Sequence, residues 1–233
     1  MRIEGTTYQS NALFTTAVLI FFSLFFLLKI VLVSSYMYSI YLLNNLISSP
    51  SELIRQDFIS SLNFSDSMTR YNVIIFILCA VSFSLWIYRA NKNLSSLRIT
   101  GLEFTPALSV WSFYIPLLCL YWPFKAVAEI WKASQPDATN TGESWKNLSA
   151  PLIIPIWWIS FIGAGILSHI INTYYPPHSL SEIKMYLFEW IVIELLLLVA
   201  TILISYIVYK INENQNNKLI MLNAPVQNSS VNV

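Results

Sequence analysis

Long apolar runs alternate with polar segments along this chain, and four of the runs are long enough to cross a bilayer, which takes about 20 residues. The runs cover residues 11–43, 71–90, 150–175 and 184–210. Backbone groups inside lipid have no water to bond, which favours helix over irregular chain. The pattern therefore predicts an all-α integral membrane protein, built as a four-helix transmembrane bundle.

The polar segments are expected to add little to this bundle. Residues 44–70 show weak amphipathic periodicity, which indicates at most one short interfacial helix. The chain from residue 211 to residue 233 is rich in Asn and Gln, a composition typical of disorder. We therefore expect a single helical membrane domain over residues 1–210, followed by a disordered cytoplasmic tail over 211–233.

The longest connection contains an apolar stretch, FTPALSVWSFYIPLLCLYWPFK, whose topology is ambiguous. No charged residue lies between Glu103 and Lys125, yet the stretch holds Pro106, Pro116 and Pro123. Pro116 removes a backbone donor and frees a carbonyl, so we expect a kink there. A freed backbone group cannot face lipid, so the turn must pack against protein or meet water. The stretch could cross the bilayer, enter and return, or lie in the interface.

Positive charge separates these topologies, because cytoplasmic loops carry an excess of Lys and Arg. If residues 104–123 do not cross and the N-terminus is inside, nine such residues face the cytoplasm and three face outward. The nine are Arg2, Arg89, Lys92, Arg98, Lys125, Lys132, Lys146, Lys210 and Lys218; the three are Arg55, Arg70 and Lys184. If the stretch crosses, five face inward and seven outward. We therefore predict a Pro-rich re-entrant or interfacial segment over 104–134, with both termini cytoplasmic.

The end of this segment reads as an amphipathic helix that Pro123 opens. Its apolar face carries Phe124, Val127, Ile130 and Trp131, and its polar face carries Lys125, Glu129 and Lys132. Lys125 and Glu129 are spaced i, i+4, which allows an ion pair. The helix is expected to lie in the inner headgroup region with Trp131 as an anchor.

Composition supports a membrane protein and excludes several other classes. The 233 residues are 56% hydrophobic and 11% charged, against about 25% charged in soluble domains. The net charge of +1 offers no field to attract nucleic acid. Cys79 and Cys119 lie inside apolar runs and give no disulfide framework or metal spacing. With no glycine-rich phosphate loop either, we expect no cofactor and no metal.

The middle of the chain resembles a known family. Four ordered elements carry the resemblance: Arg89, Ala90, Asn93 and Leu94; Phe104, Thr105 and Pro106; Ile115, Pro116, Leu120 and Pro123; and Glu129, Trp131, Lys132, Ala133 and Ser134. They are similar to the core motif of domain-of-unknown-function family 4328 (DUF4328), a group of bacterial multi-pass membrane proteins. Cys119 stands where that motif usually has Asn. The resemblance implies a bacterial inner-membrane location and lends no activity.

Ionisable residues inside membrane spans are candidates for function. The candidates in this chain are Lys29, His169, Glu189 and Glu194, and all fall toward the outer side of an N-inside topology. They could form an outward-facing site that relays protons or holds a small charged solute. Alternatively, Lys29 pairs with Glu194 and holds two helices together, because pairing cancels two costly charges.

The cytoplasmic motif is the second candidate site. Its residues are Arg89, Asn93, Pro106, Pro116, Pro123, Glu129, Trp131 and Lys132. Arg89 or Asn93 could bond carbonyls freed at Pro116, or Arg89, Lys92, Arg98, Lys125 and Lys132 could contact anionic headgroups.

Three functions remain open from the sequence. The first is a non-enzymatic membrane component that binds lipid or a protein partner through this motif. The others are a small transporter or channel and a membrane enzyme acting on lipid, although no nucleophile and base are usably arranged. Expected partners are membrane lipids and a protein partner or second copy. The small stripe Ser160, Ala164 and Ser168 lets another helix approach closely, either a helix of the same chain or one of a second copy.

Overall fold

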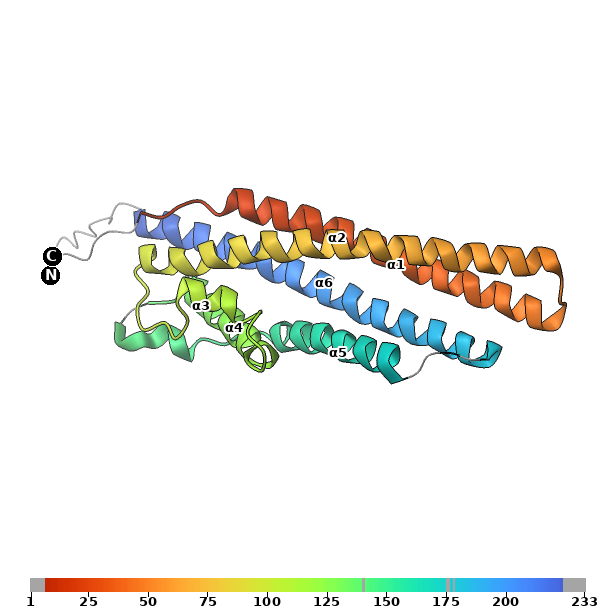
Figure 1. The fold of residues 1–233 in the computed structure, drawn as a ribbon. Helices are drawn as coiled ribbons and strands as arrows, with labels where there is room; N and C mark the ends of the chain where they lie inside the picture. The colour runs from red at the N-terminus through yellow and green to blue at the C-terminus, as the bar shows by residue number, and fades with distance from the viewer. Residues whose placement is uncertain (1–6, 140, 175–176, 178, 224–233) are drawn as a thin grey trace, which may run out of the picture. The chain divides into compact units, whose positions relative to one another are not determined.

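A computed structural model describes residues 7–139, 141–174, 177 and 179–223 (Figure 1). The described chain is helical. Its elements are α1 (Ala12–Ser48), α2 (Glu52–Ser96), α3 (Pro106–Trp111), the 3₁₀ helix η1 (Leu118–Leu120), α4 (Trp122–Ser134), the 3₁₀ helix η2 (Thr141–Asn147), α5 (Ile153–Tyr174) and α6 (Leu180–Asn223). Of the described helices, α1, α2, α5 and α6 are long and apolar enough to cross a membrane. The expected all-α class with four such helices is confirmed.

The helices α1 and α2 are longer than their apolar runs. They contain 37 and 45 residues, or roughly 55 and 68 Å at about 1.5 Å per residue. The expectation of a short, separate interfacial helix over residues 44–70 is therefore wrong. These residues instead complete α1 and α2 on either side of a short turn at Pro50. The polar part of α2 is helical because it packs along α1 and because pairs such as Asp66 and Arg70, 2.8 Å apart, support it locally.

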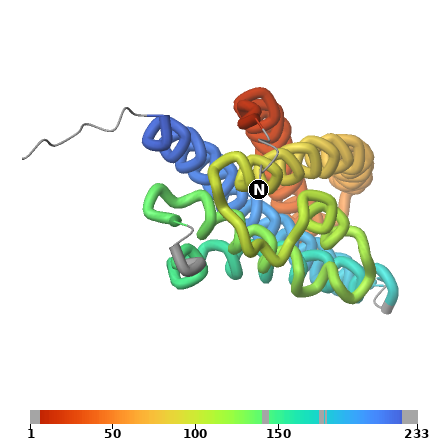
Figure 2. The backbone as a smooth tube through the Cα atoms, turned by 90° about the vertical axis from the view of Figure 1, so that its left-hand side faces the viewer, coloured from red at the N-terminus to blue at the C-terminus, as the bar shows by residue number. Residues whose placement is uncertain are grey.

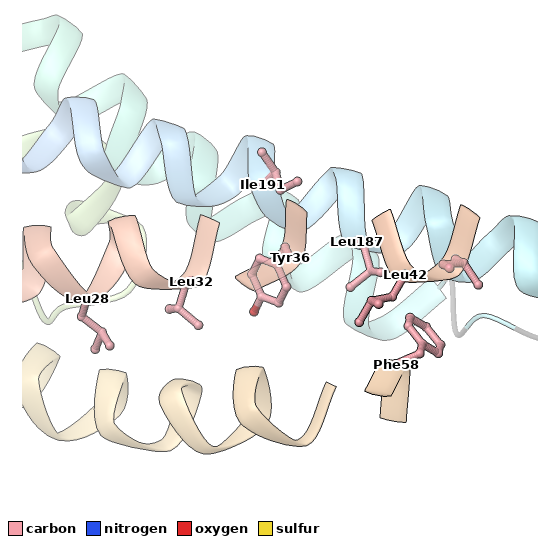
Figure 3. Packing of buried hydrophobic residues seen from close by; sticks show 8 residues of the cluster. Leu28, Leu32, Tyr36, Leu42, Phe58, Leu187 and Ile191 are labelled. Atoms are coloured by element: carbon pink, nitrogen blue, oxygen red, sulfur yellow. The ribbon is translucent and has the colours of Figure 1, made fainter. Parts of the chain in front are cut away.

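The chain divides into two compact units. Unit 2 comprises residues 16–85 and 151–206, and so holds most of the apolar length of the four long helices. One of its cores joins α1, α2 and α6 through a cluster that includes Leu28, Leu32, Tyr36, Leu42, Phe58, Leu187 and Ile191 (Figure 3). A second core joins α5 to α6 through Ala164, Ile171 and Ile193, which places Ala164 of the small stripe in contacts within the chain.

A row of serines joins α1 to α2 in unit 2. The Ser35 and Ser65 hydroxyls lie 2.7 Å apart, and those of Ser39 and Ser61 lie 2.9 Å apart. All four side chains are buried. Because serine is small, the two helix backbones approach closely along this row, and the hydroxyls satisfy one another and nearby carbonyls.

Unit 1 comprises residues 1–15, 86–150 and 207–233, which brings both ends of the described chain together with the Pro-rich segment. Tyr8 donates to the Asn216 side chain at 3.0 Å. Between α3 and α4 the chain turns back on itself (Figure 2), and α4 contacts α3, η1 and η2. Buried side chains from α2, α4 and α6, among them Leu94, Ile130 and Ile211, form the apolar interior of this unit.

The tail expected to be disordered is helical as far as the structure describes it. Helix α6 continues through Asn223, so the expectation of disorder is wrong for residues 211–223; residues 224–233 lie outside the described residues. The physical reason is burial: Ile211, Asn214, Gln215 and Lys218 follow helical spacing and are all buried in unit 1.

Candidate functional site

Glu129 ties α4 to the start of the Pro-rich segment. Its carboxylate accepts hydrogen bonds from the backbone N–H of Glu103 at 2.7 Å and of Phe104 at 3.1 Å. The α4 helix carries Glu129 on the face that meets these two residues. The expected pairing with Lys125 is replaced by two charge-assisted bonds to backbone, which suit a buried carboxylate better than an exposed side-chain ion pair.

The titration of Glu129 reflects this environment. Burial raises the pKa of its carboxyl above the ordinary 4.5, and the two backbone N–H donors and Lys146 offset part of the rise. Desolvation therefore outweighs the hydrogen bonds, and the neutral form is favoured more than in an exposed glutamate.

The sequence Phe104-Thr105-Pro106 starts α3 and fastens it to α2. Thr105 is the N-cap, and its side chain accepts from Leu108 N–H. Pro106 occupies the first turn, where its missing N–H costs nothing. Asn91, buried on α2, donates through Nδ2 to the Phe104 carbonyl at 3.1 Å and to Ser109 Oγ at 2.9 Å.

Arg89 and Asn93 bind the N-terminal segment, not the turn at Pro116. Asn93 accepts from Gln9 N–H at 3.3 Å and donates to the Gln9 carbonyl at 2.9 Å. Arg89 donates to the Gln9 side chain and lies over the Phe14 ring, 5.4 Å from its centroid. The hypothesis that either residue bonds carbonyls freed at Pro116 is therefore wrong.

The turn at Pro116 satisfies its own backbone. Leu118 N–H donates to the Pro116 carbonyl and Cys119 N–H to the Ile115 carbonyl, each at 2.9 Å. Leu117 adopts a positive φ of 65°, which is strained for a side chain with a Cβ. Cys119, at the usual Asn position, takes part through its backbone. Pro123 then lies buried in the first turn of α4.

The C-terminal end of α4 is held by two residues from α6 that sequence reasoning missed. Lys218 donates to the carbonyls of Ala133 at 3.1 Å and Ala138 at 2.7 Å. Gln215 donates to the Ala90 carbonyl at 2.8 Å and to Ser134 Oγ at 3.1 Å. The buried positions from Ile211 to Lys218 follow the i, i+3, i+4, i+7 spacing of a helix face. Because most of these positions are polar, they do not form the apolar stripe by which such a face is recognised in a sequence.

The remaining motif residues lie on the same helix. Trp131 is 9% exposed, so its ring packs within unit 1 and does not project as the expected anchor. Lys132 donates to the Lys146 carbonyl at 3.2 Å and thereby joins α4 to η2. Trp145, also in η2, donates to the Thr100 carbonyl at 3.1 Å.

The intramembrane candidates separate in unit 2. Lys29 Nζ lies 2.8 Å from Glu194 Oε2, and the two side chains are 1% and 3% exposed. Lys29 also lies 4.6 Å from the centroid of the Phe25 ring. His169 is exposed and Glu189 is half-buried. Among the described residues, no hydrogen bond or ion pair joins either of them to Lys29 or Glu194.

A comparison with family profiles matches residues 55–213 to the domain of unknown function DUF4328. The chain belongs to this family. The match begins in α2 and ends in α6, so all four motif elements of the DUF4328 chain fall inside it, while α1 and the missed residues Gln215 and Lys218 fall outside. No curated protein and no solved structure matches the chain.

The residues of the DUF4328 motif have a structural role. Its elements meet in unit 1, where Ala90, Phe104, Glu129 and Ser134 are joined by hydrogen bonds either to one another or through Asn91 and Gln215. These hydrogen bonds hold α2, α3, α4 and α6 together. What they support is the loop between α3 and α4, whose side chains face outward.

Proposed function

We propose that this DUF4328 protein is a non-enzymatic membrane component that binds lipid through unit 1. In this proposal the segment 104–123 enters one leaflet from the cytoplasmic side and returns. The observation that carries it is the outward-facing apolar tip of that segment, which we call the tip and define as residues 111–121.

The tip exposes apolar side chains at the surface of unit 1. Leu117 is 81% exposed, and five others are between 38% and 59% exposed: Trp111, Tyr114, Ile115, Leu120 and Tyr121. No charged residue lies in the tip. A patch of this kind would be unfavourable in water and is favourable against acyl chains.

The backbone of the tip is also suited to an apolar environment, in which an unsatisfied N–H costs several kcal/mol. The N–H groups of residues 112–115 and 118–121 all donate to carbonyls inside the segment, over distances of 2.9–3.3 Å. Pro116 has no N–H to satisfy. The N–H groups of the loop therefore need few acceptors from water or from a protein partner, which favours lipid as the occupant.

The two ends of the segment meet, which supports entry and exit on one side of the membrane. Glu129, beyond the segment, bonds the backbone of Glu103 and Phe104 before it, and the rings of Phe104 and Trp122 lie 5.8 Å apart. Residues near both chain ends, such as Tyr8 and Asn216, lie in the same unit. The excess of Lys and Arg in these segments favours the cytoplasmic side.

The buried pair in unit 2 favours a structural role over transport. Lys29 and Glu194 are almost fully enclosed and satisfy each other, and a transport site would need access from water. In unit 1 the buried side chains of Asn91, Glu129 and Gln215 each bond other residues of the fold, so we relate function to the exposed apolar tip.

Cys119 allows a direct test, because it lies in the tip and Cys79 is the other cysteine of the chain. In a Cys79→Ala background, a nitroxide on Cys119 in nanodiscs of phosphatidylethanolamine and phosphatidylglycerol should be accessible to oxygen and protected from a water-soluble nickel chelate. The matched control is Asp137→Cys in a chain lacking both native cysteines, since Asp137 is exposed in the same unit. Its label should show the opposite accessibility.

Two further readouts sharpen the test. Leu117→Glu should expel the tip, raising the reaction of Cys119 with a membrane-impermeant maleimide several-fold. The Asp137→Cys thiol should react with this reagent in inverted vesicles and not in right-side-out vesicles. A Cys119 label as exposed to the nickel chelate as the Asp137 control would refute lipid insertion, and the reverse vesicle pattern would refute the cytoplasmic side.

A further inference from the structure

A groove between α1 and α2 lies entirely within unit 2. Its volume is about 520 Å³, within the range of about 300–1,000 Å³ that is typical of small-molecule sites. Since α1 and α2 run side by side in opposite directions (Figure 1), each helix forms one wall. Apolar side chains, serine hydroxyls and the carboxylate of Asp57 line the groove. This mixture indicates a ligand that is apolar along most of its length and charged at one point.

The groove has a charged end and an apolar end. The Ser39 and Ser61 hydroxyls, 2.9 Å apart, show which residues of α1 and α2 lie level with each other. Asp57 precedes Ser61 and lies about 6 Å from it along α2, toward the turn between the two helices. Ile30 precedes Ser39 and lies about 14 Å from it along α1, in the opposite direction. The ends are therefore about 20 Å apart along the helices, which suits an elongated ligand.

The apolar walls resemble a surface made for acyl chains. Ile30, Val31, Tyr38 and Phe64 line the groove, and each is between 39% and 53% exposed. Exposed tyrosines are enriched at the headgroup level of membrane proteins, and Tyr38 stacks on the exposed Tyr41 with 6.3 Å between ring centroids. On this criterion Tyr38 lies at the membrane surface, while Ile30 lies about 12 Å deeper along α1, among the acyl chains.

The charged end lacks a cation. Among the described residues, none forms a hydrogen bond or ion pair with Asp57, and no Lys, Arg or His lines the groove. Arg55, Arg70 and Lys184 each have a partner other than Asp57. A carboxylate without a partner at the end of an apolar groove favours a ligand with a positive charge at the corresponding end.

A serine next to the charged end is also available to a ligand. Ser35 and Ser61 are bonded across the two helices to Ser65 and Ser39. Ser60 is exposed, and no described residue bonds its hydroxyl. This hydroxyl can therefore donate to a phosphate or ester oxygen of a ligand in the groove.

We propose that the groove binds a membrane lipid whose headgroup carries a primary ammonium, as phosphatidylethanolamine does. The ammonium contacts Asp57, the phosphate accepts from Ser60, and one acyl chain runs past Phe64 toward Ile30. The headgroup then lies outward and the chain inward, as in a bilayer. Phosphatidylglycerol has the same phosphate and chains but lacks the ammonium, so it has nothing to pair with Asp57. The inference goes beyond the proposed function, because it adds a headgroup-selective site in unit 2 that does not depend on insertion of the tip.

The test uses a carbodiimide, which joins a carboxylate to a primary amine in contact with it as an amide, with loss of one water. The full chain is treated in nanodiscs of phosphatidylethanolamine and phosphatidylglycerol in equal amounts, and mass spectrometry of its peptides quantifies the lipid coupled to Asp57. Ser60→Phe should fill the groove and reduce this coupling roughly threefold or more without altering a charge. Ser67→Phe is the matched control, because Ser67 is exposed on the same helix outside the groove; it should leave the coupling unchanged.

A second measurement keeps the test decisive if Ser60→Phe unfolds. Native mass spectrometry of the chain in a maltoside detergent, with equal amounts of the two lipids, should show bound phosphatidylethanolamine in several-fold excess over phosphatidylglycerol. Asp57→Asn, a change at an exposed position, should abolish this preference. Asp66→Asn removes the same charge from an exposed position of α2 outside the groove and should retain it.

The proposal is overturned if folded Ser60→Phe couples as much lipid at Asp57 as the wild type, or if the wild type and Asp57→Asn show the same lipid preference. A dimer of the wild type that Ser60→Phe abolishes would assign the groove to a second copy of the chain, and would also overturn it. Leu117→Glu, which should expel the tip, should leave the coupling at Asp57 unchanged. The two proposals therefore fail separately.

Discussion

Lys29 of α1 and Glu194 of α6 form an ion pair of 2.8 Å whose members are 1% and 3% exposed in the interior of unit 2. Two opposite charges in such a place cost desolvation free energy that their attraction only partly returns. The pair therefore adds little net stability, but each buried charge needs the other as its partner. It also specifies which faces of α1 and α6 meet.

This relationship predicts a non-additive response to mutation. Lys29→Met should lower the free energy of unfolding by about 3–5 kcal/mol, because it leaves Glu194 buried without a partner. The double variant Lys29→Met, Glu194→Leu should recover most of that loss. Unfolding in mixed micelles as a function of SDS fraction measures both values. Glu189→Gln is the control, because Glu189 is half-buried on the same helix as Glu194; it should change stability little. If the losses of the two single variants add up in the double variant, the two charges do not interact.

A second prediction concerns Lys218, whose ammonium bonds the Ala133 and Ala138 carbonyls. Lys218→Met keeps the length of the side chain and removes both bonds, so it should cost about 1–3 kcal/mol of stability. Hydrogen exchange of residues 133–138 and of α6 beyond residue 207 should accelerate. The control is Asn217→Met on the adjacent exposed position. Equal exchange in the two variants would mean that Lys218 does not hold α6 to α4.

The long apolar helices were predictable from sequence because lipid imposes one simple rule, that every backbone group must be bonded within the segment. The cost of burying a charge in lipid likewise predicted that Lys29 pairs with Glu194. The backbone rule says nothing about helix beyond the apolar runs, and the polar parts of α2 and α6 were missed. Those parts are helical because Ser61 and Ser65 contact α1 and because Gln215 and Lys218 bond residues of α2 and α4.

The partners within the motif could not be deduced from spacing. Asn93 binds Gln9, 84 residues away, and Gln215 binds Ala90, 125 residues away. Glu129 was expected to pair with Lys125 on the same helix. Its buried carboxylate instead accepts from the backbone N–H groups of Glu103 and Phe104, which the fold brings close to it. Local patterns predict helices and their faces; side-chain to backbone bonds between distant segments depend on the tertiary fold.

The third prediction follows from the raised pKa of Glu129. A carboxyl whose pKa is higher in the folded than in the unfolded state stabilises the fold below its unfolded pKa, and that contribution is lost as pH rises through the folded pKa. The stability of the wild type relative to Glu129→Gln should therefore fall as pH rises from 4 toward 8. Thermal unfolding of both proteins in maltoside detergent across this range measures the difference. A constant difference would show that burial does not raise the pKa, and an increasing one that the backbone bonds dominate.

The last prediction tests the serine row that joins α1 to α2. Ser39 is fully buried and lies 2.9 Å from Ser61, so Ser39→Leu adds volume where the helices approach closely and removes the hydroxyl partner of Ser61. It should cost about 1–3 kcal/mol of stability, the usual range for overpacking. Ser34→Leu is the matched control, because Ser34 is exposed on the same helix and donates to the carbonyl of Ile30; it should change stability by less than about 0.5 kcal/mol. SDS unfolding measures both variants. If the two variants lose the same stability, the close approach of α1 and α2 along this row does not constrain the fold. If only Ser39→Leu is destabilised, the small side chains of the row are what allow the polar half of α2 to pack as a helix against α1.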